Sequence, residues 1–192
     1  MTTRDRTEQP GPARPGPELA VALKPDQVYS MVDEALSSET LLGLRDALVI
    51  SLSWECMLRP KELVALDVAD LKVKKKRVRL VVRTRRDPEG DPDVPDGSRL
   101  TAKMARIWLK AAGIDEGALF RGMSKSGRVL DARLSTRALS LIVKRWAAAA
   151  GIEGRVAHGS FRIGAYLYLP AAVVRPPAGG WPWEPRRRSN AG

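Results

Sequence analysis

The sequence has few of the residues that build metal centres and disulfide frameworks. Among 192 residues there is one cysteine, Cys56, and one histidine, His158. A single cysteine excludes a disulfide framework and a multi-cysteine zinc site, and a single histidine excludes a histidine-rich metal site. The phosphate-binding pattern GxxxxGKS/T, the dinucleotide pattern GxGxxG and the nucleophile pattern GxSxG are also missing. No metal and no small-molecule cofactor is therefore expected.

Long hydrophobic runs are missing as well. The longest apolar stretches, such as ALVISLSW at residues 47–54, are much shorter than the roughly 20 residues that a membrane-spanning helix needs. The N-terminal segment has no apolar region of the kind that a secretory signal carries. These absences predict a cytoplasmic protein without a membrane partner.

Basic residues, in contrast, are in excess. The 33 lysines and arginines exceed the 22 aspartates and glutamates and give a net charge of +11. Such an excess favours a polyanionic partner, because neutralised phosphates release their counterions; the alternative is charge that only keeps the protein in solution. Residues 72–86, the basic segment, hold nine basic residues and no acidic one. These are Lys72, Lys74, Lys75, Lys76, Arg77, Arg79, Arg83, Arg85 and Arg86.

Proline divides the chain into three parts. Of the 14 prolines, five lie in residues 1–25 and five in residues 170–192. Proline lacks a backbone donor and fixes φ, so dense proline argues against packed helices at both ends. We expect a flexible proline-rich arm over residues 1–23, a folded domain over 24–169, and an irregular tail rich in proline, arginine and tryptophan over 170–192.

The folded domain shows helical periodicity with one β-rich interruption. Helices are expected to begin near residues 25, 38, 60, 101, 135 and 160. Residues 76–84 alternate basic and aliphatic side chains, which predicts a strand, with residues 93–95 as a short return strand. Residues 124–131, SKSGRVLD, predict a glycine-containing loop. The predicted fold class is α+β, mainly α-helical with a small antiparallel β-sheet.

Three stretches, in this order, carry a family resemblance. The first covers residues 44–71, where an apolar helix is followed by LRPKEL at residues 58–63 and a short helix. The second is the basic segment, and the third is AHGSFRIGA at residues 157–165. Together they resemble the catalytic domain of tyrosine recombinases, the phage integrase family, which has a Leu-Arg-x-x-Glu-Leu motif, a basic hairpin and a His-x-x-Arg box. That family usually has glycine before the leucine, where this chain has Met57.

The resemblance implies a chemistry that needs two arginines. In the family a tyrosine hydroxyl attacks a DNA phosphodiester and forms a 3′-phosphotyrosyl link without metal or ATP. Planar, permanently charged guanidinium groups suit the phosphate oxygens on which negative charge develops. Arg59 and Arg162 match the two arginine positions. The alternatives are a helix-end pair of Arg59 with Glu62, and a solvated surface position for Arg162.

Other positions depart from the family pattern. Arg85 stands where the resemblance implies a catalytic lysine, and arginine is a poor proton donor because it stays charged. The DNA-binding residues implied by the resemblance are Lys74, Lys75, Lys76, Arg83, Arg85 and Arg86. For Lys74, Lys75 and Lys76 the alternative is a run of solvated charges on an edge strand.

His158 lies four residues before Arg162, whereas the family spacing is three and places Gly159 at the matching position. Both spacings share a helix face, so His158 is a candidate acid, base or hydrogen-bond donor at the phosphate. The alternative is a surface histidine near a helix start.

The family's nucleophilic tyrosine lies in a later segment than any tyrosine of this chain. The last tyrosine is Tyr168, and we expect Tyr166 and Tyr168 to make apolar contacts rather than to act as nucleophiles. The composition of the tail indicates a shifted reading frame or a degraded gene end, and a genuine irregular tail is the alternative. The chain also starts without the family's helical core-binding domain, so we expect a catalytic domain truncated at both ends.

The sequence therefore predicts a DNA-binding protein of site-specific recombination or integration that is not competent for cleavage alone. A non-catalytic DNA-binding remnant or regulator is one alternative. An unrelated basic helical module that binds nucleic acid is another, favoured if Arg59 and Arg162 lie far apart. Double-stranded DNA is the expected partner, other recombinase subunits are a second candidate, and a DNA-bound protein would sit on the nucleoid.

Overall fold

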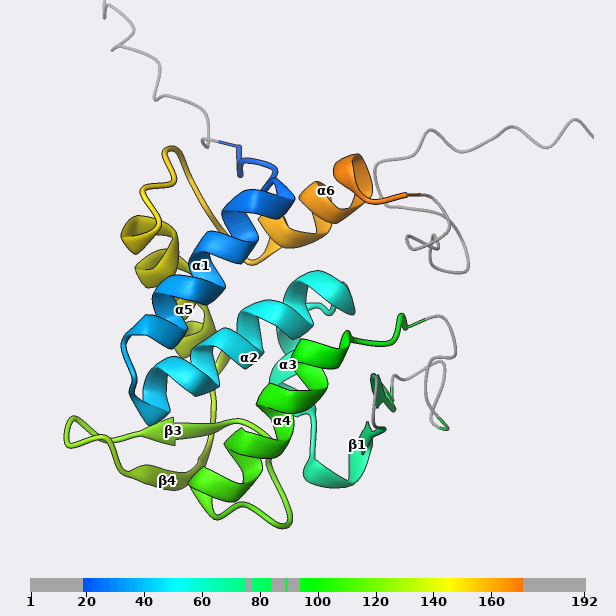
Figure 1. Cartoon of the computed structure of the whole chain (residues 1–192), viewed down its shortest axis with the longest axis vertical. Helices are drawn as coiled ribbons and strands as arrows, with labels where there is room; N and C mark the ends of the chain where they lie inside the picture. Colours follow the sequence, from blue (N-terminus) through cyan, green and yellow to red (C-terminus); the bar gives the residue numbers. More distant parts are fainter. Residues whose placement is uncertain (1–18, 75–76, 84–88, 90–93, 171–192) are drawn as a thin grey trace, which may run out of the picture.

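The computed structural model describes residues 19–74, 77–83, 89 and 94–170. Its elements follow one another as α1 (Pro25–Ser37), α2 (Leu41–Glu55), α3 (Pro60–Ala65), the 3-10 helix η1 (Val68–Asp70), β1 (Leu71–Val73), β2 (Val78–Leu80), α4 (Arg99–Ala112), β3 (Arg121–Met123), β4 (Val129–Arg133), α5 (Thr136–Ala149) and α6 (Gly159–Tyr168). Helices dominate, and the strands form two antiparallel pairs, β1–β2 and β3–β4 (Figure 1). The predicted fold class is confirmed.

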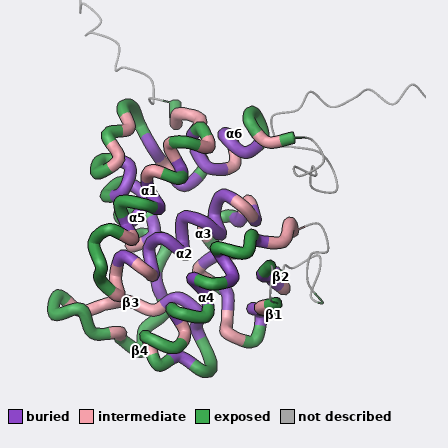
Figure 2. The backbone as a smooth tube through the Cα atoms, viewed as in Figure 1, coloured by how far each residue is buried: buried purple, intermediate pink, exposed green. Residues whose placement is uncertain are grey.

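Helix α2 lies at the centre of the molecule, with other helices packed around it (Figure 1). Eleven of its 15 residues are buried. This is expected for a helix whose surface is mostly apolar on all sides. Helices α1, α4 and α6 contact it directly. Its residues are buried without a break over 45–54 (Figure 2).

A buried carboxylate ties α2 to its neighbours. Asp46 is fully buried, and its Oδ2 accepts a hydrogen bond of 2.9 Å from Trp146 Nε1 on α5. Its Oδ1 accepts from Nε and Nη2 of Arg45 at 2.9 and 2.7 Å, and Arg45 Nη1 donates to the carbonyl of Arg121 at 3.2 Å. Because a buried charge is costly unless it is paired and hydrogen-bonded, this network fixes α5 and β3 against α2.

Helix α6 is held by the segment that leads into α1. The backbone N–H of Leu23 donates to the carbonyl of Ser160 at 3.2 Å, and that of Val21 donates to the carbonyl of Arg155 at 3.0 Å. Gly164 allows this approach, since a Cβ built there would lie 1.9 Å from the carbonyl oxygen of Leu23. The position of α6 therefore depends on residues 21–23.

The strands differ in detail from the sequence prediction. The basic segment does pair as an antiparallel hairpin, but β2 is short and pairs with β1, which precedes it, with Lys72 opposite Arg79. The expected return strand at residues 93–95 is replaced, in its described part, by a bridge in which Val78 and Gly97 exchange hydrogen bonds of 3.0 and 2.7 Å. Residues 121–133 form the hairpin β3–β4 where a loop was predicted. Gly127, at φ +78°, allows its turn.

Met57 stands at a strained position between α2 and α3. Its φ is +51°, in the left-handed region that glycine adopts readily and other residues adopt at a cost. The chain must turn there because Cys56 and Leu58, on either side, are both buried in the core. The family's glycine at this position therefore has a conformational reason, and methionine keeps the turn with strain.

We expect Met57→Gly to be more stable than Met57→Ala by about 1 kcal/mol. Both variants lose the same side chain, so their difference reports the backbone conformation alone. In an ordinary conformation glycine would instead be the less stable of the two. Urea unfolding of the two variants measures the difference, and a more stable alanine variant would contradict a left-handed residue 57.

Candidate functional site

Arg59 and Arg162 approach one another although they are far apart in the sequence. Arg59 caps the N-terminus of α3 in extended conformation, with Pro60 as the first residue of the helix. Arg162 lies on α6, beside the buried positions Phe161 and Ala165. The pKa of Arg162 is lowered by burial and by the charge of Arg59, while Glu62 opposes the shift. The charge of Arg59 thus acts unfavourably on the charged form of Arg162.

Glu62 supports Arg59 from within the first turn of α3. The backbone N–H of Arg59 donates to Oε2 of Glu62 at 2.6 Å, and Oε1 of Glu62 lies 3.9 Å from Arg59 Nε. The second distance is too long for a hydrogen bond. The Arg59 side chain remains 55% exposed, so the pairing with Glu62 orients the arginine and leaves its guanidinium accessible to a ligand.

Buried leucines on either side determine where Arg59 points. Leu58 and Leu63 are almost fully inaccessible and anchor the turn and the helix in the core. Arg59, between them, is left facing outward. On α6 the buried residues Ser160, Phe161, Gly164 and Ala165 recur at helical spacing, which places half-buried Arg162 at the border between core and surface.

His158 lies inside the protein rather than at its surface. It is 5% exposed, its Nε2 lies 3.0 Å from Oγ of Ser53 on α2, and its ring contacts Phe161 edge-on at 5.8 Å between centroids. Burial, and secondarily the charge of Arg162, lowers the pKa of His158 to about 4. The ring is therefore neutral at physiological pH, and a surface histidine is excluded.

Ser53 was not among the residues singled out from the sequence. A signal existed, because a serine on the buried part of α2 must find its hydrogen-bond partners within the protein. The sequence could not name that partner, which comes from a segment 105 residues away.

The basic segment is partly neutralised by acids that lie outside it. Asp96 pairs with Arg77 at 3.0 Å and with Arg79 at 3.6 Å, and Asp70, which is buried, pairs with Arg83. Arg83 therefore holds the base of the β1–β2 hairpin. Lys74 is exposed, whereas the predicted DNA-binding residues Lys75, Lys76, Arg85 and Arg86 lie outside the described residues.

The two tyrosines of α6 are more exposed than expected. Tyr166 and Tyr168 are 39% and 46% exposed, and Leu167 between them is 58% exposed. The apolar contacts predicted for these rings are therefore incomplete within the described part of the chain. Tyr166 follows Arg162 by one helical turn.

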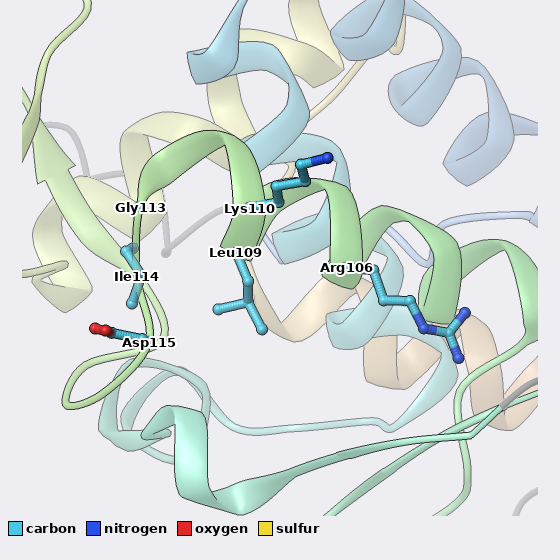
Figure 3. Close-up of a pocket in the computed structure, with 6 residues that line it drawn as sticks. All are labelled: Arg106, Leu109, Lys110, Gly113, Ile114 and Asp115. Atoms are coloured by element: carbon cyan, nitrogen blue, oxygen red, sulfur yellow. The ribbon is translucent and has the colours of Figure 1, made fainter.

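An open depression of about 490 Å³ lies at the C-terminal end of α4. Figure 3 shows that the charged side chains around it, Arg106, Lys110 and Asp115, point in different directions. Arg106 is moreover engaged with the backbone, since it donates to the carbonyl of Lys74 at 2.6 Å. The depression thus lacks the convergent polar groups of a ligand site.

The described ranges hold no group of histidine, cysteine, aspartate and glutamate side chains that could bind a metal ion. Within the same ranges, every helix falls short of the length and hydrophobicity that a bilayer crossing demands.

We expect the stability of the protein to fall as the pH is lowered from about 6.5 to about 4, in part because of His158. The folded state holds this ring with a pKa of about 4, against an ordinary value of 6.5, so in this window the unfolded state binds more protons. The contribution of His158 amounts to roughly 3 kcal/mol at most. Urea unfolding between pH 4 and pH 8 measures it.

The control is His158→Asn, which keeps a polar side chain next to Ser53 but does not titrate. Its free energy of unfolding should fall less than that of the parent between pH 6.5 and pH 4.5, whatever its value at pH 8. Equal falls in the two proteins would contradict a buried, neutral His158.

Comparison with known proteins supplies the family context. The model of the phage integrase family matches residues 22–169. Tyrosine recombinase XerC of Alcanivorax borkumensis is 31% identical over 149 residues, which cover 73% of this chain and 44% of that protein. An integrase/recombinase XerD homolog of Selenomonas ruminantium is 27% identical over 135 residues, which cover 67% of this chain and 39% of that protein.

Solved recombinase structures share the fold. XerA recombinase matches with a TM-score of 0.55 and 19% identity, over 79% of this chain and 49% of that one. XerH site-specific recombinase, bound to palindromic difH substrate in a post-cleavage complex, matches with a TM-score of 0.58 and 15% identity, over 76% of this chain and 40% of that one. This chain spans less than half the length of these relatives. Because the family match covers most of the sequence and includes both arginines, the chain belongs to the phage integrase family.

Proposed function

We propose that this chain binds double-stranded DNA in site-specific recombination or integration, and that Arg59 and Arg162 clamp one phosphate of the backbone. The observation that carries the proposal is that burial and, after it, the charge of Arg59 lower the pKa of half-buried Arg162. An anion bound by both arginines would relieve this repulsion. The net charge of +11 and the DNA substrate of the XerH structures support DNA as the source of the phosphate.

The geometry suits a phosphate diester in particular. Two planar guanidinium groups can each offer two N–H donors to the non-bridging oxygens. Arg59 approaches from the exposed side, and Arg162 from the border of the core. In a strand-transfer reaction the same donors would stabilise the charge that develops on these oxygens.

We favour a function in which this chain binds DNA and does not cleave it. Arg85 stands where the family resemblance implies a lysine, and His158 is buried and neutral. The chain would hold DNA, and a recombinase subunit would supply the nucleophilic tyrosine in trans. Such a protein would work in the cytoplasm, on the nucleoid when bound to DNA.

We expect the affinity for duplex DNA to depend weakly on sequence and steeply on salt, because contacts with phosphate carry no base information. Arg59→Ala and Arg162→Ala should each weaken binding about tenfold or more, as expected for a lost charge-assisted hydrogen bond. Each should also reduce the slope of log K against the logarithm of the salt concentration by about one in magnitude. Fluorescence anisotropy with a labelled duplex at several salt concentrations measures both quantities.

Arg128→Ala is the matched control. Arg128 is exposed in the β3–β4 turn, at the opposite end of the molecule from α6 (Figure 1), and its loss should leave the affinity nearly unchanged. Replacing Arg85 and Arg86 together tests the basic segment, which should also flatten the salt dependence. Unchanged binding in both the Arg59 and Arg162 variants would refute the phosphate clamp.

We expect the isolated chain to form no covalent adduct with DNA, even on a nicked duplex that traps the intermediate. The adduct needs a tyrosine oxygen in line with the leaving 5′-oxygen and close to phosphorus. Tyr166 shares a rigid helix with Arg162, so one short element would have to supply both the phosphate ligand and the in-line nucleophile. A denaturing gel with labelled nicked DNA detects the adduct.

Two further lanes make this experiment decisive. A full-length recombinase supplied in trans tests whether a second subunit can provide the tyrosine. A covalent band from the chain alone that disappears with Tyr166→Phe would identify Tyr166 as the nucleophile and overturn the non-cleaving form of the proposal.

A further inference from the structure

Ser53 and His158 meet in the interior of the protein, from two different helices. Ser53 lies near the C-terminal end of α2 and is fully buried, and His158 immediately precedes α6 and is 5% exposed. Their Oγ and Nε2 atoms are 3.0 Å apart, a good hydrogen-bond distance. One of the two groups must donate the proton.

The hydroxyl proton of Ser53 is already used within α2. Its Oγ donates to the carbonyl of Val49, one turn earlier, at 2.7 Å. A serine hydroxyl has a single proton and two acceptor lone pairs. Toward His158 it can therefore only accept, which requires that Nε2 of the ring carries the hydrogen.

The assignment of Nε2 leaves the other ring nitrogen as an acceptor. A neutral imidazole carries one N–H, and burial together with Arg162 keeps this ring neutral. Nδ1 of His158 is buried and has no hydrogen-bond partner among the described residues. A buried acceptor without a partner is unusual in a folded protein and calls for an explanation.

Arg162, four residues later on α6, carries a charge that acts on this ring. After burial, this charge is the second cause of the lowered pKa of His158, and a guanidinium group offers only donors. A lone pair on Nδ1 attracts that group, whereas an N–H at the same place would repel it. The choice of tautomer thus decides whether His158 favours or opposes the approach of Arg162.

We propose that Ser53 is a positioning residue, which holds His158 in the Nε2–H tautomer so that the lone pair of Nδ1 is kept for Arg162. His158 then acts through Arg162 and does not itself protonate a leaving group. The part of this inference that concerns DNA rests on the proposed phosphate clamp. The part that concerns the tautomer does not.

The tautomer can be read directly, because His158 is the only histidine of the chain. A long-range ¹H–¹⁵N spectrum of the ¹⁵N-labelled protein at pH 7.5 contains the signals of one imidazole ring. We expect the Nε2 signal in the region of protonated nitrogens and the Nδ1 signal in the region of unprotonated ones. A spectrum with the proton on Nδ1, or with averaged shifts, would overturn the inference without any variant.

Variants at position 53 then test the cause. In Ser53→Ala the two nitrogen signals should move toward one another, because the acceptor that holds the Nε2 proton is lost. Ser53→Thr keeps a hydroxyl and should retain the parent spectrum. Ser51→Ala is the control on the same buried helix and should leave the signals in place. A parent-like spectrum in Ser53→Ala would rule out a role for this hydroxyl.

The effect on the clamp is measured with the same labelled duplex. Ser53→Ala should weaken DNA binding about threefold to tenfold, the effect of one lost hydrogen bond in the network, while the salt dependence stays as in the parent. An altered tautomer with unchanged affinity would refute the orienting role. Unchanged affinity in Arg59→Ala and Arg162→Ala would refute the phosphate clamp instead, and the spectrum of His158 tells these two failures apart.

Discussion

The burial of α2 is the constraint on which the rest of the structure depends. In a helix that is enclosed along most of its length, partners for polar side chains come from the helix itself or from the elements packed against it. Asp46 receives its donor from Trp146 of α5, and Ser53 receives His158 from the start of α6. These two polar contacts fix where α5 and the start of α6 lie along the axis of α2. Apolar packing alone does not specify these positions.

The positions of Arg59 and Arg162 follow from two features, the turn that follows α2 and the attachment of α6. Where α2 stops, Met57 turns the chain with positive φ and Leu58 returns it to the core, so that Arg59 emerges beside the end of the helix. Helix α6 is held from the opposite side by the backbone of residues 21–23, whose close approach Gly164 permits. A phosphate clamp needs its donors on rigid supports, and here each arginine stands next to a residue that is locked in the core.

The sequence predicted those features of the structure that short local patterns determine, such as the starts of helices. Proline and serine at helix starts predicted α1, α3 and α5 well. The motifs LRPKEL and AHGSFRIGA supplied the two arginines of the proposed clamp, which stays a prediction. The sequence missed the β3–β4 hairpin, whose five-residue strand has little β-branched character. It also missed the neutralisation of the basic segment by Asp70 and Asp96, because those carboxylates come from outside the segment. The burial of His158 depends on Ser53, so no local pattern could reveal it.

The charge of the candidate site follows from burial as much as from composition. Arg59 and Arg162 both carry a positive charge, and Glu62 offsets part of it. A protonated His158 would add a third cation beside Arg162, within the core, where its desolvation is costly. Burial and the neighbouring arginine prevent that by lowering the pKa of the ring to about 4. Near neutral pH the proposed clamp therefore combines two arginines and one carboxylate, and a phosphate diester, which carries a single negative charge, would balance their net charge.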